Sequence, residues 1–260
     1  MPAKIGREAL VAEMARHFWL QRWQIEPGLV TPGTADADLL VERLGLPADL
    51  SGLTVLDIGA FDGAISFVCE RRGAARVVAQ DLQIRSTLRL LHDYLGSSVE
   101  FHEGSVYQLD PARIGQFDVV IFSGVLYHMR YPLLAIDRMR GVAKDRVFVE
   151  THCANVSMPP SAPPEYRYPM MFYERDEVNG DYSNWHGPAP GTVMAMFRSA
   201  GFTIEQYSAW SDRYAYHARV QPGPRPFLAE DYAAHWAYRG EIEMTPEEEA
   251  VQRPRRLAGW

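Results

Sequence analysis

Short apolar runs alternate with helical stretches from residue 54 onward, and this alternation constrains the fold of the chain more than any other feature. Such runs, bounded by turn residues, predict buried strands. Strands that alternate with helices predict a mostly parallel sheet with helices on both faces. The expected strands are 54–58, 76–79, 99–101, 117–122, 146–149, 203–207 and 214–220, and the expected helices between them are 65–72, 85–95, 133–142 and 192–200.

The segments around this core predict a cap, an insertion and a tail within one domain, 1–260. Helical spacing over 7–21 and 36–44 predicts an N-terminal helical cap in residues 1–50. Between these helices, the Pro-Gly pairs of 23–33 predict a loop without regular structure. After the fifth strand, seven prolines in 153–190 predict an irregular insertion at 151–190. The core then covers 51–220, and 221–260 is a C-terminal extension.

Charge and cysteine content narrow the class of protein. The formal net charge is −7, and Lys4 and Lys144 are the two lysines, which disfavours a partner held through many phosphates. Cys69 and Cys153 lie far apart without a disulfide or metal spacing. The longest apolar run, around 119–122, is too short to cross a bilayer, and Arg7, Glu8 and Glu13 interrupt any signal-like stretch. We therefore expect a cytoplasmic protein that is not inserted in a membrane.

The glycine segment 55–63 ends the first core strand and begins a helix, where a parallel sheet binds a nucleotide-like ligand. A dinucleotide fingerprint requires a second glycine two residues after the first, since the pyrophosphate approaches the backbone there. This chain has Phe61 two residues after Gly59. The bulky side chain favours S-adenosylmethionine, which has no phosphate. Asp57 at the strand end is suited to its amino group, directly or through water.

Asp81 ends the second core strand, where an acidic side chain is suited to bind a ribose diol. Both nicotinamide and adenosylmethionine enzymes use this position, so Asp81 indicates an adenosine ligand without choosing between them. The alternative is that Asp57 and Asp81 are only polar residues at strand ends.

These segments, with 103–107 and 117–128, resemble the class I S-adenosylmethionine-dependent methyltransferases over roughly residues 20–220. The loop 31–33 and the turn 124–128 are similar to a subgroup that includes bacterial small-molecule methyltransferases and the tRNA wobble-uridine carboxymethyltransferase. The resemblance implies an α/β, Rossmann-like, doubly wound and mostly parallel sheet of seven strands. It implies a cofactor site of Asp57, Gly59, Ala60, Phe61, Gly63, Asp81, Leu82, Ser105, Val106, Ser123 and Gly124. The chain departs from the commoner glycine-rich loop at Phe61 and Asp62.

Methyl transfer to a hydroxyl, phenol or acidic carbon needs a base, whereas other acceptors need only positioning. His128, which follows the fourth strand, is the first candidate catalytic residue. Tyr127 beside it is a candidate to orient the acceptor, and His186 is a rival base. The alternative for His128 is a structural role in its turn.

Aromatic and methionine side chains gather in 170–173 and 184–188, a composition typical of an apolar ligand pocket. We interpret this segment as an acceptor-binding lid, with a packed irregular loop as the alternative. The expected acceptor-binding residues are Trp23, Tyr173, Asn184 and Trp185. Phe18 and Trp19 are candidates to cover the cofactor mouth, or to pack in the core. His128, Glu150 and His152 lack a strong ligand spacing, so we expect no metal.

The sequence therefore predicts a methyltransferase that acts on a small, partly apolar metabolite, with specialised metabolism as the expected setting. The alternatives are a tRNA wobble-uridine (carboxy)methyltransferase, a nicotinamide-dependent oxidoreductase and a non-catalytic adenosylmethionine-binding protein. The net charge favours the small molecule over nucleic acid.

Overall fold

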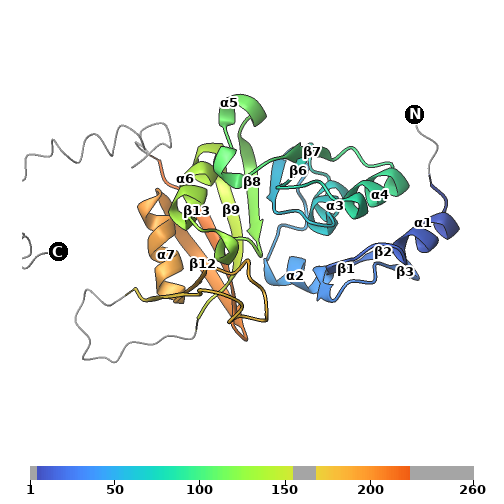
Figure 1. The fold of residues 1–260 in the computed structure, drawn as a ribbon. Helices are drawn as coiled ribbons and strands as arrows, with labels where there is room; N and C mark the ends of the chain where they lie inside the picture. Colours follow the sequence, from blue (N-terminus) through green and yellow to red (C-terminus); the bar gives the residue numbers. More distant parts are fainter. Residues whose placement is uncertain (1–4, 155–167, 223–260) are drawn as a thin grey trace, which may run out of the picture. The chain divides into compact units, whose positions relative to one another are not determined.

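The computed structural model describes residues 5–154 and 168–222 (Figure 1). The chain divides into two units, Met1–Pro226 and Phe227–Trp260, and all described residues belong to the first. The expected extension 221–260 lies outside the described residues except for its first two positions, so the single domain stays a prediction. Among the residues described, no helix has the length and hydropathy needed to cross a membrane.

A seven-stranded sheet forms the centre of the described unit. Its strands, in spatial order, are β12 (Phe202–Trp210), β13 (Arg213–Val220), β9 (Ala143–His152), β8 (Phe117–Ser123), β5 (Thr54–Ile58), β6 (Arg76–Asp81) and β7 (Glu100–Glu103). The neighbouring strands from β9 to β7 are parallel, while β13 runs antiparallel to both β9 and β12. This confirms the predicted doubly wound, mostly parallel sheet.

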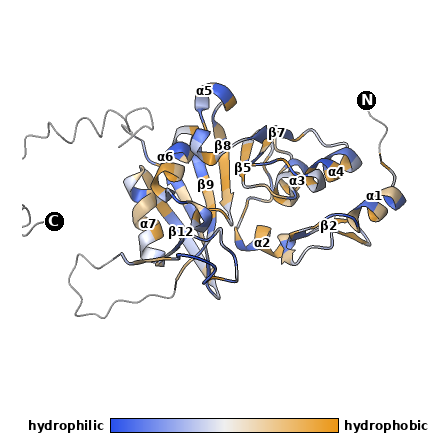
Figure 2. Cartoon of the chain, in the orientation of Figure 1, coloured by the Kyte–Doolittle hydropathy of each residue, from blue (hydrophilic) through white to orange (hydrophobic). Residues whose placement is uncertain are grey.

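Helices cover both faces of the sheet, since the central strands are apolar on both sides. The consecutive residues Val119 and Val120 of β8 enter two different core clusters, and β5 and β8 are mostly hydrophobic (Figure 2). One cluster includes α1 (Arg7–Met14), α2 (Ala37–Arg43), α3 (Ala64–Arg71) and α4 (Ser86–Leu95), and the other includes α5 (Pro111–Ile114), α6 (Pro132–Val142) and α7 (Pro190–Ser199). The short 3-10 helices η1 (Val106–Gln108) and η2 (Leu126–His128) follow β7 and β8.

The N-terminal cap differs from the sequence prediction in two respects. The first helix ends at Met14, and the segment 23–33, expected to lack regular structure, contains the strands β2 (Gln24–Glu26) and β3 (Leu29–Val30). These are flanked by the short strands β1 (Gln21–Arg22) and β4 (Ala35–Asp36). Pro27 and Gly28 form the turn of the β2–β3 hairpin, with φ of Gly28 at 72°. The two residues that suggested a loop thus terminate strands on either side of a tight turn.

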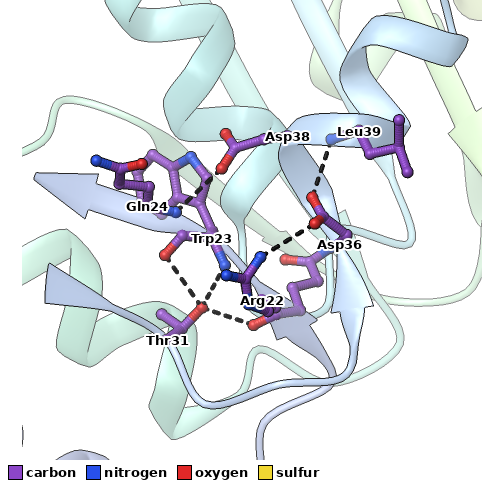
Figure 3. Close-up of polar contacts among 8 residues, drawn as sticks. Arg22, Trp23, Gln24, Thr31, Asp36, Asp38 and Leu39 are labelled. Carbon is purple, nitrogen blue, oxygen red and sulfur yellow. Dashed lines mark hydrogen bonds and ion pairs between the residues drawn. The ribbon is translucent and has the colours of Figure 1, made fainter. Parts of the chain in front are cut away.

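Side-chain hydrogen bonds hold this cap together (Figure 3). The Thr31 hydroxyl donates to the carbonyl of Gln21 at 2.6 Å and accepts from the backbone amide of Trp23 at 2.7 Å. The Asp36 carboxylate caps α2 through the amide of Leu39 and pairs with Arg22 at 3.0 Å. These contacts fix α2 relative to the strands that precede it.

Asp62 connects the cap to the core. One carboxylate oxygen accepts hydrogen bonds from the backbone amides of Leu20 and Gln21 at 2.8 and 2.9 Å, and the other accepts from the Thr87 hydroxyl at 2.6 Å. Gln21 in turn accepts from the Ala64 amide at the start of α3. The unusual Asp in the glycine segment therefore serves the packing of the N-terminal segment.

The expected insertion is partly regular where the structure describes it. The strands β10 (Met170–Phe172) and β11 (His186–Pro188) form an antiparallel pair. Residues 155–167 lie outside the described residues. From Tyr173 to Asn184 the chain forms turns and bends, so this part follows the predicted irregular course.

Candidate functional site

A cleft of about 970 Å³ opens at the carboxyl ends of the parallel strands. The strand order reverses between β5 and β8, and a parallel sheet places its ligand crevice at such a point. The ends of β5 and β6 and the residues after β7 line one half of the cleft. The end of β8 and the segment after it, the end of β9 and the β12–β13 hairpin line the other half. Residues from the expected cofactor site that line the cleft are Gly59, Phe61, Asp81, Leu82, Ser105, Val106, Ser123 and Gly124.

Asp81 presents its carboxylate at the first half of the cleft. One oxygen accepts a hydrogen bond from the Phe61 backbone amide at 2.9 Å, which leaves lone pairs on both oxygens for a ligand. Phe61 has φ of 53°, a conformation that costs energy for a bulky residue. Its ring also lines the cleft and lies 3.7 Å from the guanidinium carbon of Arg85. This half therefore offers a carboxylate and an aromatic face to a nucleoside.

The other expected cofactor residues lie beneath the cleft. Asp57 is 2% exposed and accepts a hydrogen bond from the Ser66 hydroxyl at 2.6 Å. Burial raises its pKa from 3.8 to about 6. Ala60 is 1% exposed, and a Cβ on Gly63 would lie 2.9 Å from the Phe67 ring. In the structure these residues support the glycine turn and the packing of α3, and they do not line the cleft.

Glu150, Arg213 and Tyr127 form the floor of the second half. Glu150 is 2% exposed, pairs with Arg213, and accepts a hydrogen bond from the Ser123 hydroxyl at 3.0 Å. The Arg213 guanidinium lies 4.8 Å from the centroid of the Tyr127 ring. Burial opposes the charge of Arg213, but its hydrogen bond and ion pair with Glu150 leave its pKa raised. Burial also raises the pKa of the Tyr127 phenol, so the phenol is a hydrogen-bond donor near neutral pH.

His128 reaches the cleft from η2 and is anchored on one side of its ring. Its Nδ1 lies 3.2 Å from the carbonyl oxygen of Ser183 and 3.0 Å from the Ser183 hydroxyl, which donates to Asp181 at 2.6 Å. A carbonyl only accepts, so Nδ1 carries the proton and Nε2 keeps a lone pair. Burial lowers the pKa of His128, while Ser183 and the Asp181 carboxylate act in the opposite direction. The neutral imidazole is thus favoured near pH 7.

His152 is engaged away from the cleft. Its Nδ1 lies 2.8 Å from the Asp212 carboxylate and its Nε2 lies 3.0 Å from the Tyr173 hydroxyl. Tyr173 thereby joins the segment before β11 to β9 and does not line the cleft. Across the described ranges, no group of three or more His, Cys, Asp or Glu side chains is placed to hold a metal ion.

Of the other candidate residues in 184–188, one lines the cleft and two do not. Trp185 lines the cleft, beneath the guanidinium of Arg130. Asn184 is buried and its amide donates to the Val178 carbonyl at 2.9 Å. His186 is 3.5 Å from the Arg130 carbonyl through Nε2, and its Nδ1 is buried without a partner among the described residues. Neither Asn184 nor His186 lines the cleft.

The aromatic residues of the N-terminal segment also differ in whether they reach the cleft. Trp23 is 1% exposed, stacks on Phe67 at 5.8 Å, and carries the Arg71 guanidinium on its ring. Trp19 is likewise buried. Phe18 is 74% exposed and lines the cleft. The structure therefore places Trp23 in the core, out of reach of an acceptor, and Phe18 at the mouth.

Several cleft residues were not anticipated from the sequence as cofactor or acceptor contacts. These are Gln21, Arg43, Gln80, Arg85, Arg130, Glu150, Asp181, Ser183, Trp210 and Arg213. Arg213 and Trp210 flank the turn between the edge strand β12 and its neighbour β13, and the pairing of β13 with β9 brings them to the cleft. Glu150 and Gln80 are polar residues near the carboxyl ends of β9 and β6. This position could have identified them from the sequence as candidates to line the cleft.

Residues 56–149 match the family described as a methyltransferase domain. A tRNA U34 carboxymethyltransferase of Methylococcus capsulatus is 28% identical over 182 residues, which are 64% of this chain and 50% of the relative. The chain thus spans about half the length of this curated relative.

Solved structures share the fold at low identity. The N-terminal domain of EvdMO1 with S-adenosylhomocysteine bound has a TM-score of 0.62 and 18% identity, covering 84% of this chain and 98% of that domain. A 1,6-didemethyltoxoflavin-N1-methyltransferase of Burkholderia thailandensis has a TM-score of 0.52 and 19% identity, covering 71% and 76%. The [4+2]-cyclase SpnF has a TM-score of 0.56 and 17% identity, covering 82% and 92%.

The match of residues 56–149 to the methyltransferase-domain family and the fold shared with the solved structures confirm the resemblance inferred from the sequence. The cyclase among the similar structures shows that this fold also serves another reaction, so the acceptor and the chemistry must be argued from the site.

Proposed function

We propose that the chain catalyses methyl transfer from S-adenosylmethionine to a small, partly apolar acceptor. The observation that carries the proposal is the cleft itself. One continuous space of about 970 Å³ joins the Asp81 half to the His128 half. This volume is at the upper end of the range of small-molecule sites, about 300–1,000 Å³, and leaves room for a cofactor and a small acceptor together.

The residues of the first half fit the cofactor. Asp81 lines this half with a carboxylate that suits a ribose diol, and Phe61 and Val106 supply apolar surface that suits a planar base. Gly59 has φ of 78°, and a Cβ there would collide with a methyl carbon of Val125, so only glycine allows the turn to close against the segment after β8. When bound, S-adenosylmethionine supplies a methyl group activated by a positively charged sulfur.

The residues of the second half position the acceptor and remove its proton. Nε2 of His128 is free of hydrogen bonds to described residues, and His128 lines the cleft with its neighbours Tyr127 and Ser183. It accepts the proton of an acceptor hydroxyl or phenol during attack. Tyr127 donates a hydrogen bond that orients the acceptor. Ser183 holds the required tautomer of His128.

The test measures S-adenosylhomocysteine release from S-adenosylmethionine with a panel of hydroxylated aromatic and aliphatic acceptors. The proposal expects turnover with at least one small acceptor, a large loss of turnover in His128→Gln, and unchanged affinity for S-adenosylhomocysteine in that variant. His186→Gln is the matched control, because His186 does not line the cleft. Equal activity in the two variants would contradict the proposal that His128 is the base.

The alternative that the sequence relative favours is modification of the tRNA wobble uridine. Against it stands the net charge of −7 with two lysines, because tRNA affinity depends on neutralising phosphates. Binding of bulk tRNA at low salt, with affinity that falls steeply as salt rises, would support the alternative. Transfer to tRNA without transfer to any small acceptor would overturn the proposal.

A further inference from the structure

Two arginines stand over tryptophan rings in the acceptor half of the cleft. The guanidinium carbon of Arg130 lies 4.5 Å from the centroid of the Trp185 ring, and that of Arg43 lies 4.7 Å from the centroid of the Trp210 ring. All four residues line the cleft. Arg130 follows η2 and Trp210 ends β12, so each pair includes a residue from the half formed by the segments after β8 and β9 and by the β12–β13 hairpin. Arg43, at the end of α2, reaches this half through its contact with Trp210.

The charges of these arginines are not neutralised by neighbouring carboxylates. Within residues 5–154 and 168–222, neither Arg43 nor Arg130 has a carboxylate within ion-pair distance. The carboxylates of this half have other partners: Asp36 pairs with Arg22, Glu150 pairs with Arg213, and Asp181 accepts from Ser183. Asp181 keeps its negative charge, since a hydroxyl does not neutralise it, so the two arginines leave a local excess of positive charge in a chain whose net charge is −7.

The stacked arrangement leaves the hydrogen-bond donors of the guanidinium available. Stacking uses the face of the guanidinium, while its N–H groups point outward in its plane and match the two oxygens of a carboxylate. The tryptophan holds the arginine in place, so less side-chain entropy is lost when an anion binds. Leu39, Leu40 and the two indoles line the same half and supply apolar surface.

We propose that the methyl acceptor is a planar, apolar molecule with a carboxylate, held by Arg43 and Arg130 between Trp210 and Trp185. The carboxylate binds a guanidinium edge, and the apolar body packs on the indoles and leucines. The positive charge also concentrates anionic acceptors at the mouth of the cleft. This inference rests on the proposed function, because it assigns the second half of the cleft to the acceptor.

The experiment compares binding of 2-naphthoate and 2-naphthamide, which differ in charge but hardly in shape. Affinities are measured by calorimetry at low ionic strength, with saturating S-adenosylhomocysteine to fill the cofactor half. We expect 2-naphthoate to bind about tenfold more tightly than the amide, since a hydrogen bond to a charged group contributes about that factor. The preference should shrink in Arg43→Gln and Arg130→Gln.

Arg89→Gln is the matched control. Arg89 also stacks on an aromatic ring, that of Phe101 at 5.3 Å, but it does not line the cleft, so this variant should keep the full preference. Thermal unfolding of each variant establishes that it is folded. Equal affinity for acid and amide, no binding of 2-naphthoate at millimolar concentration, or a preference that survives in both cleft variants would overturn the proposal.

Two further titrations identify the anion and test the cofactor half separately. If bulk tRNA displaces 2-naphthoate from the wild type, and this competition is lost in Arg43→Gln and Arg130→Gln, the natural anion is a phosphodiester. That result would overturn the proposal of a small carboxylate acceptor. A titration with S-adenosylhomocysteine alone tests the proposed function, because a protein that does not bind it is not a methyltransferase of this kind. The role of the two arginines is tested separately, by titrating 2-naphthoate and 2-naphthamide into the cofactor-free protein.

Discussion

Nδ1 of His128 lies 3.0 Å from the hydroxyl of Ser183, and that hydroxyl donates its proton to Asp181. The chain of contacts orients the imidazole and fixes the tautomer with a free Nε2. His128 and Ser183, the first two members of this relay of His128, Ser183 and Asp181, are 55 positions apart in sequence. It brings the segment before β11 into the site at the turn that follows β8.

The Asp181 carboxylate raises the pKa of His128 against the larger, opposite effect of burial. Asp181→Asn should therefore lower the pKa of His128 further, because the charge that stabilises the imidazolium is lost. An NMR titration of the imidazole carbon-bound protons measures this without an acceptor. Asp176→Asn, in the same loop, is the control. A rise in the pKa of His128 in Asp181→Asn, or the same change in both variants, would contradict the relay.

Asp57 predicts a pH dependence of stability. Its pKa is about 6 in the folded protein and 3.8 as the ordinary value, so the folded state binds the proton more tightly. The stabilisation is complete below pH 3.8 and is lost as pH rises through 6. The difference in unfolding free energy between wild type and Asp57→Asn should fall by about 2–3 kcal/mol between pH 4 and pH 7. Denaturant titrations at several pH values measure it, and a difference that stays constant or grows would refute the raised pKa.

The buried pair of Glu150 and Arg213 predicts a large cost for breaking it from one side. Arg213→Gln leaves the Glu150 carboxylate buried without its cation, which should cost about 3 kcal/mol of unfolding free energy or more. The double variant Glu150→Gln and Arg213→Gln should recover part of this loss. Arg16→Gln, which breaks an exposed pair with Glu13, should cost less than about 1 kcal/mol. Equal costs for the two arginine variants would contradict the burial of the pair.

The sheet, and the edge of it where the cleft opens, were predictable because they depend on local sequence. Apolar runs fix strands, and parallel strands bring their carboxyl ends to one edge, which places Gly59, Asp81 and Ser105 together. The N-terminal segment was less predictable, since the Pro27-Gly28 pair is compatible with either a loop or a hairpin turn. Trp23 was expected to bind the acceptor, but it stacks on Phe67 and Arg71, contacts that depend on tertiary packing.

The acceptor half depends on long-range pairing and could not be predicted from spacing. Arg213 reaches the cleft because β13 pairs antiparallel with β9, and Arg43 does so because the end of α2 lies against Trp210 of the β12–β13 hairpin. Ser183 and Asp181 are ordinary turn residues in sequence. Their role follows from their position beside His128.

The most direct test of the account is calorimetric titration of the protein with S-adenosylhomocysteine and, separately, with NADH. We expect one-site binding of S-adenosylhomocysteine and no binding of NADH. In Asp81→Ala we expect the affinity for S-adenosylhomocysteine to fall by more than about tenfold, because the ribose hydrogen bonds to a charged group are removed. Asp93→Ala, an exposed acid on α4 outside the cleft, should bind like wild type. Binding of NADH without S-adenosylhomocysteine, or an unchanged dissociation constant in Asp81→Ala, would contradict the assignment of the cleft.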